Sequence, residues 1–249
     1  MNAGPNASTL ELTRARAFTR LELAATVTAL FLLSLVVLPV LANTKPRADR
    51  VTCVNNLRLL GRAEHIWATD HEDQMPWWVD ESEGGARWSI LRNNAWFNYG
   101  VMTNELGTPT ILACPSDAGT RPARDFSSVA GGFFHPGNKN NSVSYFIGLH
   151  SFLTDVRWSS GYAQGVIQKA LAGDRNLRPD SYQSCSCGID YTAVVYGRYS
   201  AQWTNSIHGL VGNILMLDGQ VAQISNSRVR QAIDAPVDDN APAHLLMPH

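Results

Sequence analysis

Hydrophobic residues are most concentrated near the N-terminus, from Leu21 to Leu41, where the chain reads LELAATVTALFLLSLVVLPVL. The single charged residue of this stretch is Glu22. About 20 apolar residues in a helix, rising about 1.5 Å each, cross a hydrocarbon layer of about 30 Å. The stretch also exceeds the roughly 7–15 apolar residues of a secretory signal. The pattern therefore predicts one membrane-spanning helix. Its basic flanks are balanced, so they do not set its orientation.

A second helical pattern follows, from Arg47 to about Asp70. Pro46 is expected to open this helix because its fixed φ suits a first turn, and Met75-Pro76 is expected to end the stem. Apolar residues recur at three- and four-residue spacing, which predicts a buried face: Cys53, Leu57, Leu60, Ala63 and Trp67. The polar side chains are expected elsewhere on the helix, namely Asn56, Arg58, Arg62 and Glu64.

The remaining chain favours short strands and loops over long helices. Trp88 to Met102 could hold one short helix, and Ser142–Leu149 is β-branched and aromatic, which predicts a strand. Ile167–Arg175 suits either a strand or a short helix. Asn213–Leu217 and Gln220–Ile224 predict a hairpin around a two-residue Asp218-Gly219 turn. The Pro-rich residues 235–249 are expected to form a loose tail.

Composition narrows the function classes. The 249 residues suit one ordinary domain plus an appendage. A net charge of −1 with scattered basic residues gives no indication of a nucleic-acid partner. The charged fraction of 16% accompanies too many apolar residues for a disordered chain.

The four cysteines allow three full disulfide pairings, and the sequence alone does not choose among them. Cys185 and Cys187 are one residue apart, which suits a direct bridge poorly and does not match zinc-ligand spacing. A disulfide role is therefore favoured over a metal role.

Glu22 is unusual because a carboxylate in hydrocarbon costs about 2.5–3.5 kcal/mol at mid-helix. Taken alone, it could lie one turn from the interface and reach water. Its surroundings change this interpretation. The segment RAFTRLEL before the apolar run resembles the cleavage and methylation signal of type IV prepilins and type II secretion pseudopilins.

That resemblance implies cleavage of the Ala17–Phe18 bond by a prepilin peptidase and methylation of the new Phe18 amine. Glu22 then falls at the fifth mature place, where the family keeps a glutamate, and Pro39 at the twenty-second, where many members carry a kinking proline. The Phe18 amine of one subunit would neutralise Glu22 of the next. Two positions depart from the family pattern: Ala17 stands where Gly is usual, and Arg20 stands at a usually apolar place.

Four further phrases resemble a pseudopilin-like family named for an H-x9-DG motif. They are CVNNLRLLG from Cys53, CPSD from Cys114, AGDR from Ala172, and the motif itself, with His208 followed by Asp218 and Gly219. The resemblance makes Cys114 the natural partner of Cys53. Asp218 and Gly219 are foremost turn residues, since no nucleophile motif accompanies a His–Asp pair.

Together the resemblances imply an α+β, pilin-like fold: a long N-terminal transmembrane and stem helix, then an antiparallel β-sheet head. The expected parts are a cytoplasmic leader (1–17), an assembly helix (18–42), a stem (43–76), a head (77–234) and the tail (235–249).

The implied function is structural and not enzymatic: a subunit of a type II secretion or type IV pilus-like assembly. It would span the bacterial inner membrane once, N-terminus cytoplasmic and head periplasmic or extracellular. Its partners would be the peptidase and copies of itself or related pseudopilins. No cofactor is expected, although some relatives hold Ca²⁺ in a C-terminal loop.

Two alternatives stay open. A membrane-anchored envelope protein with a ligand-binding or hydrolytic head would need convergent titratable groups near His208. A DNA-uptake pseudopilin would need a basic patch on its head, which the scattered Lys and Arg do not form in the sequence.

Overall fold

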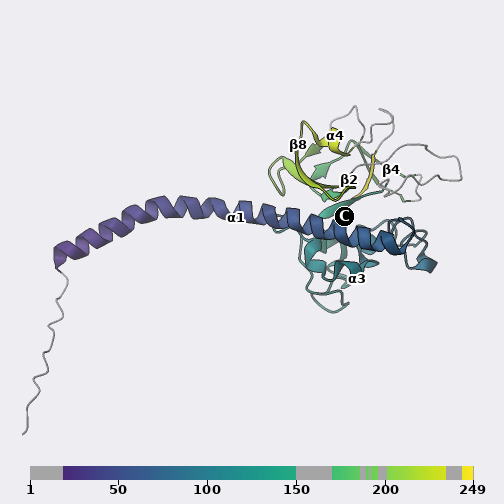
Figure 1. Ribbon diagram of the computed structural model, residues 1–249, viewed down its shortest axis with the longest axis horizontal. Coiled ribbons are helices and arrows are strands. Elements are labelled where there is room, and N and C mark those ends of the chain that lie inside the picture. The colour runs from purple at the N-terminus through teal and green to yellow at the C-terminus, as the bar shows by residue number, and fades with distance from the viewer. Residues whose placement is uncertain are drawn as a thin grey trace, which may run out of the picture. The chain divides into compact units, whose positions relative to one another are not determined.

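The computed structural model describes residues 19–149, 170–185, 189–190, 192–195, 201–233 and 243–248, and within its helices the side chains of 39–44 and 230 are left aside. The chain divides into two units, Met1–Lys45 and Pro46–His249. Helix α1 (Arg20–Asp70) contributes to both, and strands follow only in the second (Figure 1).

The first turn of α1 is closed by its own side chains. Glu22 N–H donates to Thr19 Oγ1 at 3.2 Å, and Thr19 N–H donates to Glu22 Oε2 at 2.9 Å. This reciprocal pair is a capping box, and it satisfies backbone donors that a helix start leaves unpaired. Glu22 therefore has a local structural role that the sequence analysis missed, although Thr-x-x-Glu is its signature.

The expected apolar span lies within α1. Arg20–Leu38 is long and apolar enough to cross a membrane. Its large side chains point outward, with Leu21 81% and Phe31 62% exposed. Such a surface is stable only when lipid or another protein covers it.

The expected start of a separate helix at Pro46 is wrong. Helix α1 is one element of 51 residues, and the residues on both sides of Pro46 are helical. Proline lacks one backbone donor, which weakens a helix interior without necessarily ending it. The rule that places proline at helix starts therefore gave the wrong boundary.

The C-terminal half of α1 has the predicted buried face. Cys53, Leu57 and Leu60 are fully buried, and Ala63 and Trp67 nearly so. The helix approaches the sheet closely at Gly61, where an added Cβ would lie 2.9 Å from Leu215 Cδ1.

The expected exposure of Glu64 is wrong. It follows Leu57 by seven and Leu60 by four residues, so helix geometry puts it on the buried face, and it is 0% exposed. Both its carboxylate oxygens lack a hydrogen-bond partner within the described residues.

Short helices fill the segment between α1 and the sheet. One of them, α2 (Ala95–Gly100), lies within Trp88–Met102 and confirms the short helix expected there. Thr108 caps η2 by accepting a bond from Thr110 N–H. The others are η1 (Glu81–Glu83), α3 (Thr103–Leu106), η2 (Pro109–Leu112) and η3 (Lys139–Ser142).

The main sheet has seven strands in the order β4-β5-β9-β1-β2-β7-β8, and every pairing within it is antiparallel. The strands are β1 (Tyr145–Gly148), β2 (Ala170–Asp174), β4 (Ser181–Gln183), β5 (Thr192–Val195), β7 (Val211–Met216), β8 (Val221–Ser225) and β9 (Ala243–Leu246). A small second sheet pairs β3 (Leu177–Arg178) with β6 (Gln202–Trp203), and α4 (Val229–Ile233) follows β8. Mixed helix and antiparallel sheet is therefore the fold class.

Two expectations about this sheet have clear outcomes. Strands were expected within Ser142–Leu149 and, as one option, within Ile167–Arg175, and β1 and β2 confirm them. The loose tail expected over 235–249 is wrong for Ala243–Leu246. These residues form β9, fully integrated between β5 and β1, because their apolar side chains are buried on both faces.

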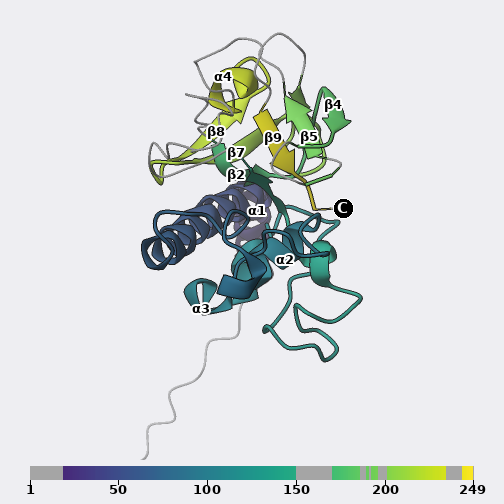
Figure 2. The same ribbon diagram turned by 90° about the vertical axis from the view of Figure 1, so that its right-hand side faces the viewer.

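The sheet carries a core on each face. Along β1, Tyr145 and Ile147 belong to the cluster that contains α1 and α2, and Phe146 belongs to the opposite cluster. This alternation is the two-residue period of a strand. Figure 2 shows α4 on the side of the sheet away from α2. Because both faces are buried, the central strands read as apolar runs.

The predicted hairpin is confirmed, with one change in its turn. β7 and β8 pair from Val211–Ser225 to Leu215–Val221. Met216 N–H donates to Gln220 O, so the loop is the three residues Leu217–Gly219. Gly219 has φ +81°, the left-handed conformation that closes such a turn with a bulge.

Glu64 generates a testable prediction. Burial raises its pKa well above the usual 4.5, so the folded chain holds a proton that the unfolded chain releases above about pH 4.5. Stability should fall as pH rises above that value, by up to about 1.4 kcal/mol per pH unit. Glu64→Gln should remove the contribution of Glu64 and so change the slope of stability against pH in melting curves recorded from pH 4.5 to 8. The exposed Glu83→Gln is the control, and an unchanged pH profile in Glu64→Gln would contradict the assignment.

Candidate functional site

Four sequence phrases meet in one buried polar cluster between α1 and the sheet. We call this cluster the clasp network. It consists of Cys53, Asn56, Cys114, Asp117, Ser144, Asp174, Arg175, His208 and Asn213. All of its members belong to the unit Pro46–His249.

A disulfide joins Cys53 of α1 to Cys114, which follows η2, across 61 residues of sequence. This is the pair implied by the family resemblance. Both cysteines are buried. Asn56, one turn along α1, donates from Nδ2 to the Ala113 carbonyl at 3.0 Å. The helix is thus attached to the CPSD segment by a covalent bond and an adjacent hydrogen bond.

Asp117, the last residue of the CPSD phrase, is the most connected acid of the network. Arg175 contacts it with two nitrogens, Nε to Oδ2 at 2.7 Å and Nη2 to Oδ1 at 3.0 Å. Thr120 and Ser144 hydroxyls donate to Oδ2 at 2.6 and 2.8 Å. Ser144 Oγ in turn accepts the Cys114 N–H at 3.0 Å. Asp117 therefore fixes the backbone that carries Cys114.

These bonds decide the charge of Asp117. Burial alone would raise its pKa, but the hydrogen bonds from Arg175, Thr120 and Ser144 outweigh burial and leave the pKa below its usual value. Asp117 is therefore ionised at neutral pH, paired with the Arg175 guanidinium in the two-pronged geometry that suits carboxylates.

Asp174, at the end of β2, is the second acid. Its Oδ2 accepts the backbone N–H of Asn213 at 2.7 Å and the Asn213 side-chain amide at 3.0 Å. The same Oδ2 lies 3.5 Å from His208 Nε2. That nitrogen is 3.4 Å from Cys114 Sγ, so His208 touches both the disulfide and Asp174.

Burial has opposite effects on the two titratable groups of this contact. It raises the pKa of Asp174 to about 7, partly offset by the Asn213 bonds. It lowers the pKa of His208 to about 4, helped by the positive charge of Arg50. At neutral pH the imidazole is neutral, so the 3.5 Å contact between His208 and Asp174 is not an ion pair.

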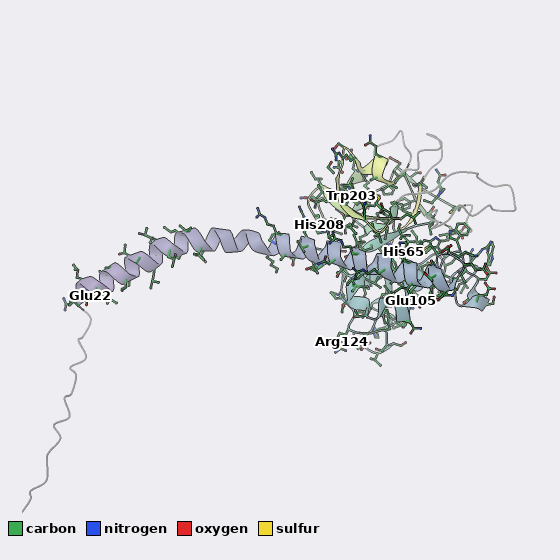
Figure 3. All side chains as sticks on the ribbon, viewed as in Figure 1. Glu22, His65, Glu105, Arg124, Trp203 and His208 are labelled. Atoms are coloured by element: carbon green, nitrogen blue, oxygen red, sulfur yellow. A yellow bond between two sulfur atoms is a disulfide. The ribbon has the colours of Figure 1, made fainter. Side chains whose placement is uncertain are left out.

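The loop before β7 positions His208. Gly209 and Leu210 both have left-handed backbones, with φ of +67° and +58°. Arg50 of α1 donates from Nη2 to the His208 carbonyl at 3.0 Å. In Figure 3 the His208 label lies beside α1. The histidine is therefore held by its backbone as well as its ring.

The structure does not join His208 to the Asp218 of its motif. Asp218 is exposed in the β7–β8 turn and accepts the N–H of Gln220 at 2.9 Å. Gly219 supplies the left-handed residue of that turn. The acid beside His208 is Asp174, from the AGDR phrase. Spacing within one motif could not reveal this, because the partner lies on another strand.

The N-terminal candidates lie apart from the network in sequence. Ala17 and Phe18 lie outside the described residues, and so does Cys187. Pro39 is within α1. Glu22 is exposed and bonded to Thr19. Cys185 is disulfide-bonded, which agrees with the disulfide role expected of the cysteines. Residues 234–242 also lie outside the description, so the calcium expectation stays a prediction.

The side chains of the clasp network bond to one another, so the network holds α1 and the neighbouring segments together. Its two acids are held by neighbouring side chains, and its sulfurs are bonded to each other. Asp117, Arg175 and Asn213 were not singled out as a set, although the CPSD and AGDR phrases contain two of them.

Comparison of the chain with protein-family models, with curated proteins and with solved structures finds no match. The geometry and the sequence therefore carry the functional argument.

Asp117 provides the test of the network. Asp117→Ala leaves the Arg175 guanidinium without its partner, and breaking such a buried pair costs about 3 kcal/mol or more. Urea unfolding of the full chain at pH 7 measures this. The difference from wild type should narrow below about pH 3.8, where the unfolded-state carboxyl protonates.

The control for this measurement is Asp125→Ala, which removes an exposed acid and should change stability by less than about 0.5 kcal/mol. Equal effects of the two variants would contradict the central place given to Asp117.

Proposed function

We propose that the chain is a membrane-anchored, pseudopilin-like assembly subunit of a type II secretion or type IV pilus-like system, with a structural and not an enzymatic role. In this proposal a prepilin peptidase cleaves before Phe18, and the N-terminal part of α1 lies in the bacterial inner membrane. The globular unit lies outside the cytoplasm. Copies of the chain or related subunits associate through their apolar helices.

The observation that carries the proposal is the outer surface of Arg20–Leu38. This helix is long and apolar enough to span a membrane, and its large side chains are exposed. One carboxylate, Glu22, stands at its start. The capping box alone accounts for a glutamate or glutamine there, and a helix that packs against the N-terminal amine of a neighbour would use the negative charge as well.

The Glu22 geometry is compatible with both a local and an intermolecular role. Both Thr19 donors use Oε2. Within the described residues Oε1 accepts no hydrogen bond, which leaves it for the amine of a neighbouring subunit. The charge, rather than the cap alone, is then what assembly requires.

The clasp network supports a structural rather than an enzymatic role for the globular unit. The residues that sequence reasoning would offer to a hydrolytic head, His208 and the nearby acids, are buried and engaged with one another. A disulfide that ties α1 to the CPSD segment suits a chain that must keep its shape outside the cytoplasm.

Glu22 variants separate its two roles. Glu22→Gln keeps the capping box, since Gln serves at that position, but removes the charge. Glu22→Ala removes both, and Thr19→Ala removes the cap alone. We expect all three to enter the membrane. Both Glu22 variants should lose cross-linked oligomers by at least about tenfold, the effect of about 1.4 kcal/mol on association.

The readout is membrane fractionation followed by chemical cross-linking in a host that carries the assembly machinery. Thr19→Ala should retain oligomers near the wild-type level. Wild-type oligomer yield in Glu22→Gln would contradict the proposal, because it would show that the charge is not used.

A further inference from the structure

The clasp network contains the atoms of a metal site. Among the described residues, ligand atoms of Cys53, Cys114 and His208 lie within 4.8 Å of one another, and all three residues are buried. Asp174 Oδ2 is 3.5 Å from the same imidazole nitrogen that faces Cys114. Asp174 Oδ1 is buried and has no hydrogen-bond partner in the described part of the chain.

We propose that Cys53, Cys114, His208 and Asp174 bind Zn²⁺ when the Cys53–Cys114 disulfide is reduced. The same residues would then fasten α1 to the sheet in two exclusive ways, by a disulfide when oxidised and by a metal when reduced. The inference concerns the globular unit alone and does not depend on the proposed assembly role.

The distances fit a tetrahedral ion. Zinc bonds of about 2.3 Å to sulfur and about 2.0 Å to nitrogen or oxygen give tetrahedral edges of about 3.5 Å between S and N and about 3.3 Å between N and O. The structure has 3.4 Å from Cys114 Sγ to His208 Nε2 and 3.5 Å from that nitrogen to Asp174 Oδ2. Two edges of the tetrahedron are thus present before any metal enters.

The sulfurs must separate. Reduction breaks their bond, and zinc thiolates lie about 3.8 Å apart at tetrahedral angles. Cys53 is on α1 and Cys114 is on a loop after η2, so rotation of the two side chains can supply this movement while both backbones stay fixed. Cys53, on α1, is the fourth of the proposed ligands.

The remaining ligands are held by neighbours, as metal ligands commonly are. The Asn213 backbone N–H and side-chain amide both donate to Asp174 Oδ2 and so hold the oxygen that faces His208. Arg50 holds the His208 backbone, and Ser144 holds the N–H of Cys114. Zinc ligands with such support need little reorganisation on binding.

The chemistry balances with a dithiol reductant. The reductant gives two electrons and two protons to the disulfide, producing two thiols, and is itself oxidised to a disulfide. Zn²⁺ then displaces the two thiol protons and binds two thiolates, the neutral imidazole and the carboxylate. A disulfide oxidant reverses the change: it takes two electrons from the thiolates and two protons from solvent, becomes a dithiol, restores the Cys53–Cys114 bond and so releases the ion.

Cobalt serves as the optical probe for the test. The full chain, in detergent and carrying Cys185→Ser and Cys187→Ser, is reduced with a dithiol, freed of it anaerobically and titrated with Co²⁺. We expect one ion per chain, with thiolate-to-metal charge transfer and the visible bands of tetrahedral cobalt, both lost on adding Zn²⁺. The oxidised chain should show neither.

Variants assign the ligands. His208→Gln and Asp174→Asn should weaken cobalt binding at least about tenfold, whereas Asp218→Asn, in the exposed turn, should leave it unchanged. Bands that are absent from the reduced chain, or that are unaffected by His208→Gln, would overturn the proposal.

A second measurement covers failure of a variant to fold. In the reduced chain with wild-type His208 and Asp174, Zn²⁺ should slow alkylation of Cys53 and Cys114 at least about tenfold relative to a chelator control, as read by mass spectrometry. Equal alkylation rates, or a reduced chain that unfolds and is not restored by Zn²⁺, would equally overturn the proposal.

Discussion

The attachment of α1 to the sheet is the constraint on which the globular unit depends. One face of the C-terminal half of α1 supplies a large part of the core, and the Cys53–Cys114 disulfide fixes that face in register with the segment before β1. In a chain-entropy account, closing a loop of 61 residues stabilises the fold by about 4 kcal/mol. The hydrogen bonds of Asn56 and Asp117 then hold the backbone on the far side of the bridge.

Three buried acids of the globular unit differ in their hydrogen-bond partners and in their protonation. Asp117 is ionised against Arg175 and favours folding at neutral pH. Glu64 has no hydrogen-bond partner among the described residues, keeps its proton in the fold and favours folding at acidic pH. Asp174 is intermediate, bonded to Asn213 and adjacent to a neutral His208. The pKa of Asp117 is lowered, so its contribution to stability is lost on acidification. The pKa values of Glu64 and Asp174 are raised, so their contributions are lost as the pH rises.

The periodic parts of the fold could be predicted from the sequence. The apolar spacing of Cys53, Leu57 and Leu60 gave the buried face, and Asp218-Gly219 gave the β7–β8 hairpin. The charge of Glu64 led to the wrong expectation that it is exposed, although its spacing from Leu57 indicates the buried face. β9 was missed because a short strand among prolines has no local period, and only its pairing with β1 and β5 identifies it.

The sequence predicted which residues belong to the candidate site better than it predicted which of them contact one another. The phrases around Cys53, Cys114, Asp174 and His208 were all noticed, but no local rule assigns Asp174 rather than Asp218 to His208. That assignment follows from the antiparallel pairing of β2 with β7, which sets Asp174 beside Asn213. Contacts between distant strands are decided by topology, which spacing within a motif does not contain.

The central claim is that a prepilin peptidase cleaves the chain before Phe18, and that subunits then associate through the apolar N-terminal part of α1. The most direct measurement is the N-terminus and intact mass of the protein extracted from the membranes of its native host. The account predicts a chain that begins at Phe18 and is heavier by one methyl group. A chain that still begins at Met1 would indicate a plain anchored domain. A cut beyond Leu41 would indicate an exported soluble protein. Either result would contradict the assembly role.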